Sequence, residues 1–390
     1  MQALKIYAGA CAFKHIKTNG LKPEDIKVIA GAAGGPKGLL LGPLDRFIFG
    51  DWLRAPQIPP QISPHTAPHF IDLIGASIGA WRMGAACMLD PVLASKRLEH
   101  DYIHQQYDIP RGKRRPSAEV VSAQFKETLN DFFADHVKDV LNHPTFKLNV
   151  VTSKGKYILA KEGKVSTPAG YALAYLSNIA SRQLLGIWLE RTLFSVPRER
   201  VNVSSATTHN VENLAQMCLD LNFDWRADGF QSSQVELNSS NLTQAIQASC
   251  SIPFVMHSVS GIPGAPKGAY WDGGITDYHL HWDYNSVAPG FVLYPHFQRS
   301  LVPGWLDKAL KWRHGSTQFL DRVIVLAPNP NWVAKLPNSK LPDRQDFVRY
   351  AKDPTTRIKI WQKAVSESEQ LADEFAAWLA NPGSIQLEVL

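Results

Sequence analysis

Three short glycine-containing segments carry the residue types that an acyl-transfer site needs. They are residues 33–38 (AGGPKG), 75–79 (GASIG) and 271–274 (WDGG). Between them they offer a serine hydroxyl, a carboxylate and backbone N–H groups on tight turns. These are the nucleophile, the base and the oxyanion donors of ester hydrolysis. Each segment is weak evidence alone, so the prediction depends on finding all three in one chain.

Ser77 is the candidate nucleophile, because it stands in a Gly-x-Ser-x-Gly pattern between an apolar run and a helical pattern. Such a turn lifts serine out of a sheet on a strained strand-to-helix connection. The residues two positions away, here Gly75 and Gly79, must be small so that strand and helix can approach closely. The alternative is that Ser77 is only a small residue in a tight turn.

The glycine loop is the candidate oxyanion hole. Gly34 and Gly35 directly follow an apolar run, and their N–H groups would lie at the positive end of a helix dipole. Pro36 has no N–H, so the donors must be Gly34 and Gly35, joined by the N–H of Ile78 after the serine. Such donors can stabilise an oxyanion without any side chain.

The same loop does not match a nucleotide site. Lys37 precedes Gly38, whereas a phosphate-binding P-loop has its lysine followed by Ser or Thr. The dinucleotide pattern G-x-G-x-x-G is also missing from the sequence. His279 and His281 have H-x-H spacing, but no further metal ligands accompany them. We therefore expect neither cofactor nor metal, and we expect Lys37 and Gly38 to support the loop, Lys37 by hydrogen bonds.

Asp272 is the candidate base, because it follows Tyr270 and Trp271 and precedes Gly273 and Gly274. A strand that ends in a glycine turn places a carboxylate rigidly, with open space beside it. The carboxylate must lie within about 2.6–3.2 Å of the hydroxyl to accept its proton. Apolar neighbours would raise the pKa of Asp272 and make it a stronger base. The alternative is an Asx turn, in which the side chain caps its own backbone.

Composition indicates an ordinary globular protein. The chain has 390 residues, of which 45% are hydrophobic and 19% charged, and its net charge of +6 is too diffuse to indicate nucleic-acid binding. No apolar run reaches the roughly twenty residues that span a bilayer, and the start of the chain lacks a secretion leader. The four cysteines are scattered, which favours free thiols. We expect a cytoplasmic protein, with signal-less secretion left open.

The elements that would position the three segments alternate between strands and helices. Apolar runs at 26–33 and 69–76 predict buried parallel strands, and 38–53 and 78–89 predict the helices that follow them. This alternation predicts an α/β fold with a layered sheet. Further strands are expected at 147–153, 156–161, 234–237, 291–294 and 322–326, and further helices at 93–107, 118–140, 171–193 and 242–249.

Connections and boundaries follow from composition. A proline-rich connection is expected at 56–68 and a basic loop at 111–116, and residues 327–343 are dense in proline and asparagine. We therefore expect one catalytic domain over 1–327, followed over 328–390 by a linker and a C-terminal helical extension. Apolar residues at helical spacing in the extension favour packing against the body of the protein.

Together these residues resemble the patatin-like phospholipase family. The resemblance covers about residues 5–327 and includes the segment 248–254 (ASCSIPF), which is similar to the approach to the family's catalytic aspartate. It implies a three-layer α/β sandwich with a central, mostly parallel sheet, and a Ser77–Asp272 dyad without histidine. Two departures are Ala33, where the family often has glycine, and 276–279 (TDYH) after Asp-Gly-Gly. The second leaves the wall beside the aspartate, and thus the substrate, open.

The resemblance implies a lipid acyl hydrolase of the phospholipase A or lysophospholipase type. Its partners would be a lipid or lysolipid substrate and, transiently, a membrane surface. One alternative is an α/β-hydrolase esterase with a Ser-Asp-His triad, since four histidines follow Asp272 in the chain: His279, His281, His296 and His314. Another is a non-catalytic lipid-binding protein of the same fold. The lipid class and the oligomeric state are not determined by the sequence.

Overall fold

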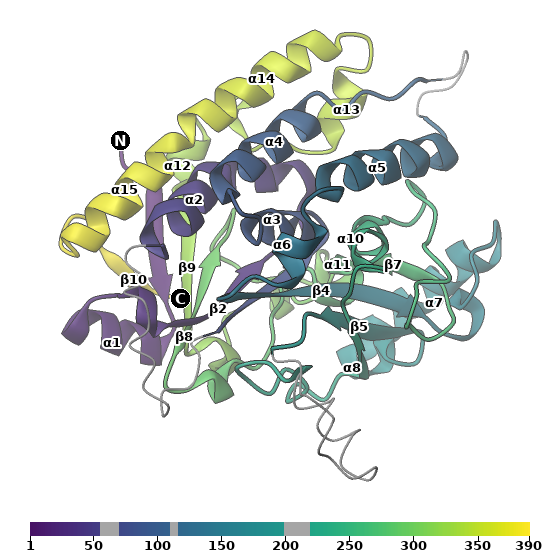
Figure 1. The fold of residues 1–390 in the computed structure, drawn as a ribbon, viewed down its shortest axis with the longest axis horizontal. Helices are drawn as coiled ribbons and strands as arrows, with labels where there is room; N and C mark the ends of the chain where they lie inside the picture. Colours follow the sequence, from purple (N-terminus) through teal and green to yellow (C-terminus); the bar gives the residue numbers. More distant parts are fainter. Residues whose placement is uncertain (55–69, 110–115, 199–218) are drawn as a thin grey trace.

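A computed structural model describes residues 1–54, 70–109, 116–198 and 219–390 (Figure 1). The connection expected at 56–68, the basic loop except Pro116, and Cys218 lie outside these residues. The other cysteines, Cys11, Cys87 and Cys250, are free thiols, as their spacing predicts.

Within the described residues, the fold is built on one ten-stranded sheet of order β10-β1-β9-β8-β2-β3-β4-β5-β6, with β7 paired to β4. Its strands are β1 (Leu4–Ala8), β2 (Ile26–Gly31), β3 (Ile71–Ala76), β4 (Phe146–Gly155), β5 (Leu189–Ser195), β6 (Ser232–Glu236), β7 (Tyr270–Asp272), β8 (Phe291–Pro295), β9 (Val323–Pro328) and β10 (Leu387–Val389). Only the pairings β1–β9, β4–β5 and β4–β7 are antiparallel among these strands. This confirms the predicted α/β class with a central, mostly parallel sheet.

Helices connect most of the strands. They are α1 (Ala10–Asn19), α2 (Gly42–Phe47), α3 (Ile78–Ala86), α4 (Pro91–Ile103), α5 (Ala118–Phe133), α6 (Val137–Leu141), α7 (Ser166–Ala180), α8 (Arg182–Leu185), α10 (Leu242–Cys250), α11 (Gly274–Asp277), α12 (Pro330–Val333), α13 (Gln345–Arg349), α14 (Pro354–Glu367) and α15 (Glu369–Ala380). A 3₁₀ helix, Gly35–Leu41, links β2 to α2.

Apolar layers cover both faces of the sheet. The larger core lies under α2, α3, α4, α5, α10, α14 and α15, which Figure 1 shows along one side of the strands. The opposite face packs against α7, α11 and the irregular segment that follows α11. Successive side chains of a strand point to opposite faces, so Tyr270 joins the first core and its neighbour Trp271 joins the second. Strands β2 and β3 are buried on both faces and are therefore almost entirely apolar.

Four predicted elements differ from the structure. The helix predicted at 118–140 is two helices, α5 and α6, and the helix predicted at 38–53 is a 3₁₀ helix, α2 and a π helix (Ile48–Trp52) in succession. No second strand forms at 156–161, because β4 runs on to Gly155 and the chain then makes a 3₁₀ turn in which Tyr157 has a φ of 47°. The single helix predicted at 171–193 is divided by Ser181, which has extended backbone and caps α8 with its side chain. The last residues of that segment form β5, antiparallel to β4. Apolar periodicity alone does not separate a buried strand from a helix.

The C-terminal residues 328–390 join the same sheet. They form the helices α14 and α15, at the helical spacing seen in the sequence, and then β10, which pairs in parallel with β1. The carboxylate of Glu374 on α15 accepts hydrogen bonds from the N–H groups of Ala3 and Leu4, at 2.9 and 2.8 Å. Among the described residues, none of the helices combines the length and apolar character required to cross a membrane.

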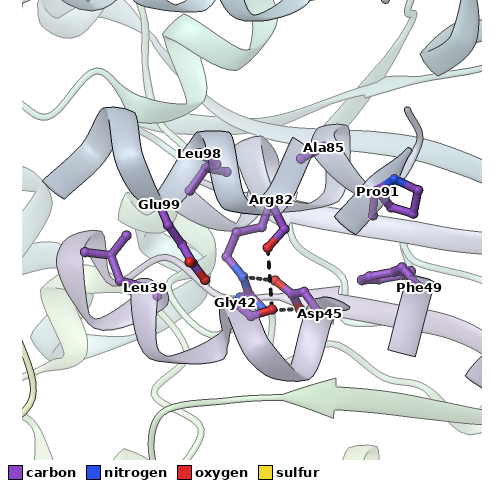
Figure 2. Close-up of a pocket in the computed structure, with 12 residues that line it drawn as sticks. Leu39, Gly42, Asp45, Phe49, Arg82, Ala85, Pro91, Leu98 and Glu99 are labelled. Carbon is purple, nitrogen blue, oxygen red and sulfur yellow. Dashed lines mark hydrogen bonds and ion pairs between the residues drawn. The ribbon is translucent and has the colours of Figure 1, made fainter. Parts of the chain in front are cut away.

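A buried ion pair fixes the helix that follows Ser77. Figure 2 shows Arg82 on α3 between α2 and α4, donating from Nε and Nη2 to the two carboxylate oxygens of Asp45, both at 2.7 Å. Both side chains are buried, and the bidentate geometry makes the contact directional. The crevice around the pair, about 10 Å³, holds neither Ser77 nor Asp272 and has room for little more than one water molecule.

We expect Arg82→Met to lower the free energy of unfolding by about 3–5 kcal/mol, because Asp45 would remain buried without its partner. Chemical denaturation measures this loss. The double variant Arg82→Met/Asp45→Leu should lose less, since it removes both charges. A loss below about 1 kcal/mol in the single variant would contradict this role for the pair.

Candidate active site

Ser77 occupies the sharp turn between β3 and α3. Its φ of 57° and ψ of −128° are strained for a residue with a side chain, as a nucleophile turn requires. A Cβ on Gly75 would lie 2.4 Å from Ala80 Cα, and a Cβ on Gly79 would lie 1.9 Å from Gly31 O. Glycine at both positions is therefore a condition of the close approach of α3 to β2 and β3.

Asp272 is the last residue of β7 and is held by its backbone. It pairs with Thr152 of β4, and its carbonyl oxygen accepts a hydrogen bond from Ser153 Oγ at 2.9 Å. The next two residues leave no room for side chains, because a Cβ on Gly273 would lie 2.1 Å from a backbone oxygen and one on Gly274 would lie 2.6 Å from Ala33 Cβ. The glycine turn thus brings the carboxylate against the glycine loop.

The structure brings the candidate nucleophile and base together. Ser77 Oγ donates a hydrogen bond to Asp272 Oδ2 at 2.8 Å, and both side chains are buried. Asp272 Oδ1 accepts the N–H of Gly274 at 2.8 Å, which orients the carboxylate. On the other side, Ser77 N donates to Ser249 Oγ at 2.9 Å, and Ser249 Oγ donates to Val151 O at 2.6 Å. Sequence reasoning did not single out Ser249, although it lies in the segment that carries the family resemblance.

The environment of Asp272 favours its action as a base. Burial raises the pKa of Asp272 above its ordinary value, the direction predicted from its apolar neighbours. The positive charge of Arg344, the hydrogen bond from Ser77, the N–H of Gly274 and the charge of Lys308 oppose this rise without reversing it. Asp272 therefore attracts a proton more strongly than an exposed aspartate does.

The glycine loop lies beside the dyad. Gly34 lines the same cavity as Ser77 and Asp272, and within the described residues its N–H donates to no protein acceptor. Gly35 has a φ of 57° and begins the 3₁₀ helix, while Ile78 begins α3. The first N–H groups of a helix have no partner inside the helix. All three predicted oxyanion donors thus belong to turns that leave such groups available.

Lys37 differs from its expected supporting role. In the part of the chain that the structure describes, it makes no hydrogen bond to the loop. Its ammonium instead lies 5.1 Å from the centre of the Phe297 ring, and the side chain lines the cavity. Burial lowers the pKa of Lys37. Gly38 keeps the loop close to α3, since a Cβ there would lie 3.1 Å from the side chain of Ile78.

A cavity of about 240 Å³ opens over the dyad. Its lining contains the apolar residues Ile252, Pro253, Ile275, Tyr278 and Trp305 and the three cations Lys37, Lys308 and Arg344. Sequence reasoning missed Trp305, Lys308 and the segment 343–345, because no local pattern marks them. Their place in the site becomes visible only when the chain is folded.

None of the four histidines after Asp272 bonds to either member of the dyad in the described structure. His279 Nδ1 accepts the N–H of Val302 at 2.9 Å, and its ring lies 4.3 Å from that of His296. Burial lowers the pKa of His279, and lowers that of His296 to about 3. His281 lies beside Thr317 Oγ1, and His314 lies beside a backbone oxygen. This geometry favours a direct Ser–Asp contact over a histidine triad.

Comparison with known proteins adds no relative. The sequence matches no model of a protein family, and no curated protein is significantly similar to it. Among the described residues, no group of three or more His, Cys, Asp or Glu side chains could hold a metal ion. The case for the site therefore rests on its own residues and geometry.

We expect hydrolysis of a neutral aryl ester to decline with acid through a pKa above the ordinary aspartate value of 3.8, since Asp272 must be ionised to act. Arg344→Gln should move this acid limb to higher pH, because it removes the positive charge that most favours the carboxylate. The measurement is kcat/KM against pH, with circular dichroism showing where the fold is intact. An acid limb at or below pH 3.8 would contradict the assignment.

Proposed function

We propose that this protein is a serine hydrolase of lipid acyl esters, of the phospholipase A or lysophospholipase type. The observation that carries the proposal is the 2.8 Å hydrogen bond from the strained Ser77 to the buried Asp272, at the floor of a cavity that Gly34 also lines. A nucleophile turn, a carboxylate and unpaired backbone N–H groups in one cavity are the parts of an acyl-transfer site.

The reaction would proceed in two halves. Asp272 takes the proton of Ser77 while Oγ attacks the ester carbonyl, and N–H groups of Gly34, Gly35 and Ile78 stabilise the oxyanion. The carbon–oxygen bond to the alcohol then breaks, and the alcohol leaves with the proton held by Asp272. Water, deprotonated by Asp272, attacks the acyl-serine, and the fatty acid departs as Ser77 recovers its proton.

A lipid substrate is supported by the apolar surface near the cavity. The cavity is smaller than the roughly 300–1,000 Å³ of pockets that enclose drug-sized ligands, so most of a lipid would lie outside it. Helix α7 contains no charged residue, although much of it is exposed. We define the α7 apolar face as the exposed side chains of Leu173, Leu176, Ile179, Leu184 and Ile187.

This face continues to the cavity along two segments. The ring of Tyr171 on α7 lies 5.9 Å from that of Phe254, which is 60% exposed and follows the cavity residue Pro253. Arg313 donates to the carbonyl oxygen of Ile179 at 3.2 Å, which places the exposed Trp312 next to the end of α7. Helix α7 thus contacts the segment that follows Pro253, and the proposal takes its exposed apolar face to adjoin the entrance to the site.

Cations flank the apolar side chains. Lys308 and Lys311, both exposed, belong to the segment that leads from the cavity to Trp312, whereas Arg313 beside them is paired with Asp307. An exposed apolar face with an exposed tryptophan and basic residues is complementary to a lipid surface that carries negative charge. We therefore propose that the α7 apolar face docks on such a surface while the ester enters the cavity.

The catalytic assignment is tested with a fluorophosphonate probe and a short-chain aryl ester. Wild-type protein should be labelled and active. Ser77→Ala should lose labelling and at least about 1000-fold in kcat/KM, and Asp272→Asn about 100- to 10,000-fold. Asp272→Asn should keep or raise the melting temperature, because at neutral pH it removes a buried charge whose raised pKa disfavours the folded state.

His281→Asn and His314→Asn serve as controls and should retain activity within a few fold, since neither side chain contacts the dyad. A loss of several orders of magnitude in either variant would favour the triad. Robust turnover by folded Asp272→Asn protein would refute the dyad. Failure of wild-type protein to be labelled would favour a non-catalytic lipid-binding protein.

The docking surface is tested by flotation with vesicles of phosphatidylglycerol and phosphatidylcholine. Leu176→Glu and Ile179→Glu should reduce vesicle binding at least about tenfold and leave hydrolysis of a soluble aryl ester unchanged. Leu93→Glu on α4, where leucine is 65% exposed, is the matched control and should bind like wild type. Equal binding by all variants, or a wild-type dimer that these substitutions dissociate, would overturn the proposal.

A further inference from the structure

Three cations from separate parts of the chain meet at the catalytic cavity. Lys37 follows the glycine loop, Lys308 follows a 3₁₀ turn of residues Trp305–Asp307, and Arg344 precedes α13. The cavity also contains Asp343, and Lys340 Nζ lies 2.7 Å from the Asp343 carboxylate and 2.8 Å from that of Asp346. Asp272 is engaged by Ser77 and Gly274. The four cations Lys37, Lys308, Lys340 and Arg344 therefore face three carboxylates, those of Asp272, Asp343 and Asp346, which leaves a net positive charge at the cavity.

Arg344 lies closest to the predicted oxyanion loop. Its Nε stands 3.0 Å from the point that a Cβ on Gly35 would occupy, so a side chain at Gly35 would collide with the guanidinium. Within the described residues, Arg344 makes no ion pair and no hydrogen bond. A guanidinium has five N–H donors in a planar fork that matches the oxygens of a phosphate or carboxylate. Those donors face the cavity without a protein acceptor.

The backbone that carries Arg344 is held by the neighbouring residue Asp346, which is buried, whereas the Arg344 side chain is exposed. The carboxylate of Asp346 accepts hydrogen bonds from Lys340 Nζ at 2.8 Å, from the N–H of Asp343 at 3.0 Å and from Trp361 Nε1 on α14 at 3.0 Å. These contacts tie the start of α13 to the long C-terminal helix. A rigid backbone keeps the exposed guanidinium near the cavity, so binding a ligand there loses less entropy than it would for an arginine on a mobile segment.

Lys308 also lines the cavity. Its Nζ lies 4.0 Å from the centre of the Tyr278 ring. Burial of the ammonium, together with the positive charges of Arg344 and Lys37, lowers the pKa of Lys308 to about 8. The side chain thus remains positive at neutral pH, and a negative ligand between these groups would relieve their mutual repulsion.

We propose that Arg344 and Lys308 form a subsite for a phosphate group that neighbours the ester in the substrate, so that the enzyme prefers anionic acyl esters to neutral ones. The preference in hydrolysis rests on the proposed hydrolase function, whereas binding of the phosphate group does not. The subsite makes the C-terminal segment around Arg344 part of the site, although the catalytic dyad lies within residues 1–327.

Kinetics on a matched substrate pair test this preference. The pair is a short-chain monoacylglycerol and its glycerol phosphate monoester, each kept below its micellar concentration. Wild-type kcat/KM should be at least about tenfold higher for the phosphate ester. Arg344→Gln should lower kcat/KM about 10- to 100-fold on the phosphate ester, the effect of losing a charged hydrogen bond, and less than threefold on the neutral ester.

Arg349→Gln is the matched control, because Arg349 is the last residue of α13, the helix that Arg344 precedes, and its guanidinium stands over Tyr350, outside the cavity lining. It should leave both substrates unaffected. Equal losses on both substrates in Arg344→Gln would assign the arginine to the oxyanion and overturn the subsite. A wild-type enzyme that does not distinguish the two esters would overturn it as well.

Binding to Ser77→Ala protein tests the subsite without catalysis. Calorimetry should show tighter binding of the phosphate ester than of the neutral ester, and the preference should vanish in Ser77→Ala/Arg344→Gln. Inorganic phosphate is the third ligand. Weak binding of it beside strong binding of the ester supports a headgroup subsite, whereas equal binding of both overturns it in favour of a general anion site. If this preference is found but wild type hydrolyses no ester, the proposed function fails and the subsite stands.

Discussion

The close approach of α3 to the sheet is the constraint on which the site depends. A Cβ on Gly79 would lie 1.9 Å from Gly31 O, and a Cβ on Gly75 would lie 2.4 Å from Ala80. Because Gly75 and Gly79 have no side chains, Ser77 alone separates the end of β3 from the start of α3. The turn lifts Ser77 out of the sheet. The Asp272 carboxylate then has a hydroxyl within 2.8 Å. Every other part of the site is arranged around this contact.

The contact combines two features that disfavour folding. Ser77 has a strained backbone, and the Asp272 carboxylate is buried with a raised pKa. Both are held in place by rigid surroundings: β7 pairs with β4, and Ser249 accepts the N–H of Ser77 while donating to β4. Such sites are stable only because the rest of the fold overcomes their strain, as in other proteins that trade stability for activity.

Local sequence was sufficient for the centre of the fold. Strands buried on both faces are continuous apolar runs, so β2 and β3 were predictable, and the glycine turns that follow them are local patterns as well. The edge formed by β10 and β1 was not predictable in this way, whereas the β6 strand at the other edge was expected at 234–237. Strands β1 and β10 are short and pair across nearly the whole chain, Ile6 with Leu387. The prediction of a single helix at 171–193 was wrong for another reason. The apolar residues of this segment fit a helix or a buried strand equally well.

The three cations that line the cavity, Lys37, Lys308 and Arg344, could not be predicted as a group either. Lys308 and Arg344 have no local sequence pattern, and they meet the dyad only in the folded chain. Their charges have two opposed effects. Arg344 attracts anions, but it also opposes the rise in the pKa of Asp272 that burial produces. A bound phosphate would offset the guanidinium charge, so Arg344 would lower the pKa of Asp272 less. The pKa of Asp272 would then rise further, and the carboxylate would become a stronger base at the moment when the substrate occupies the cavity. If the proposed hydrolase function and phosphate subsite hold, recognition of the anion and activation of Ser77 are coupled through one arginine.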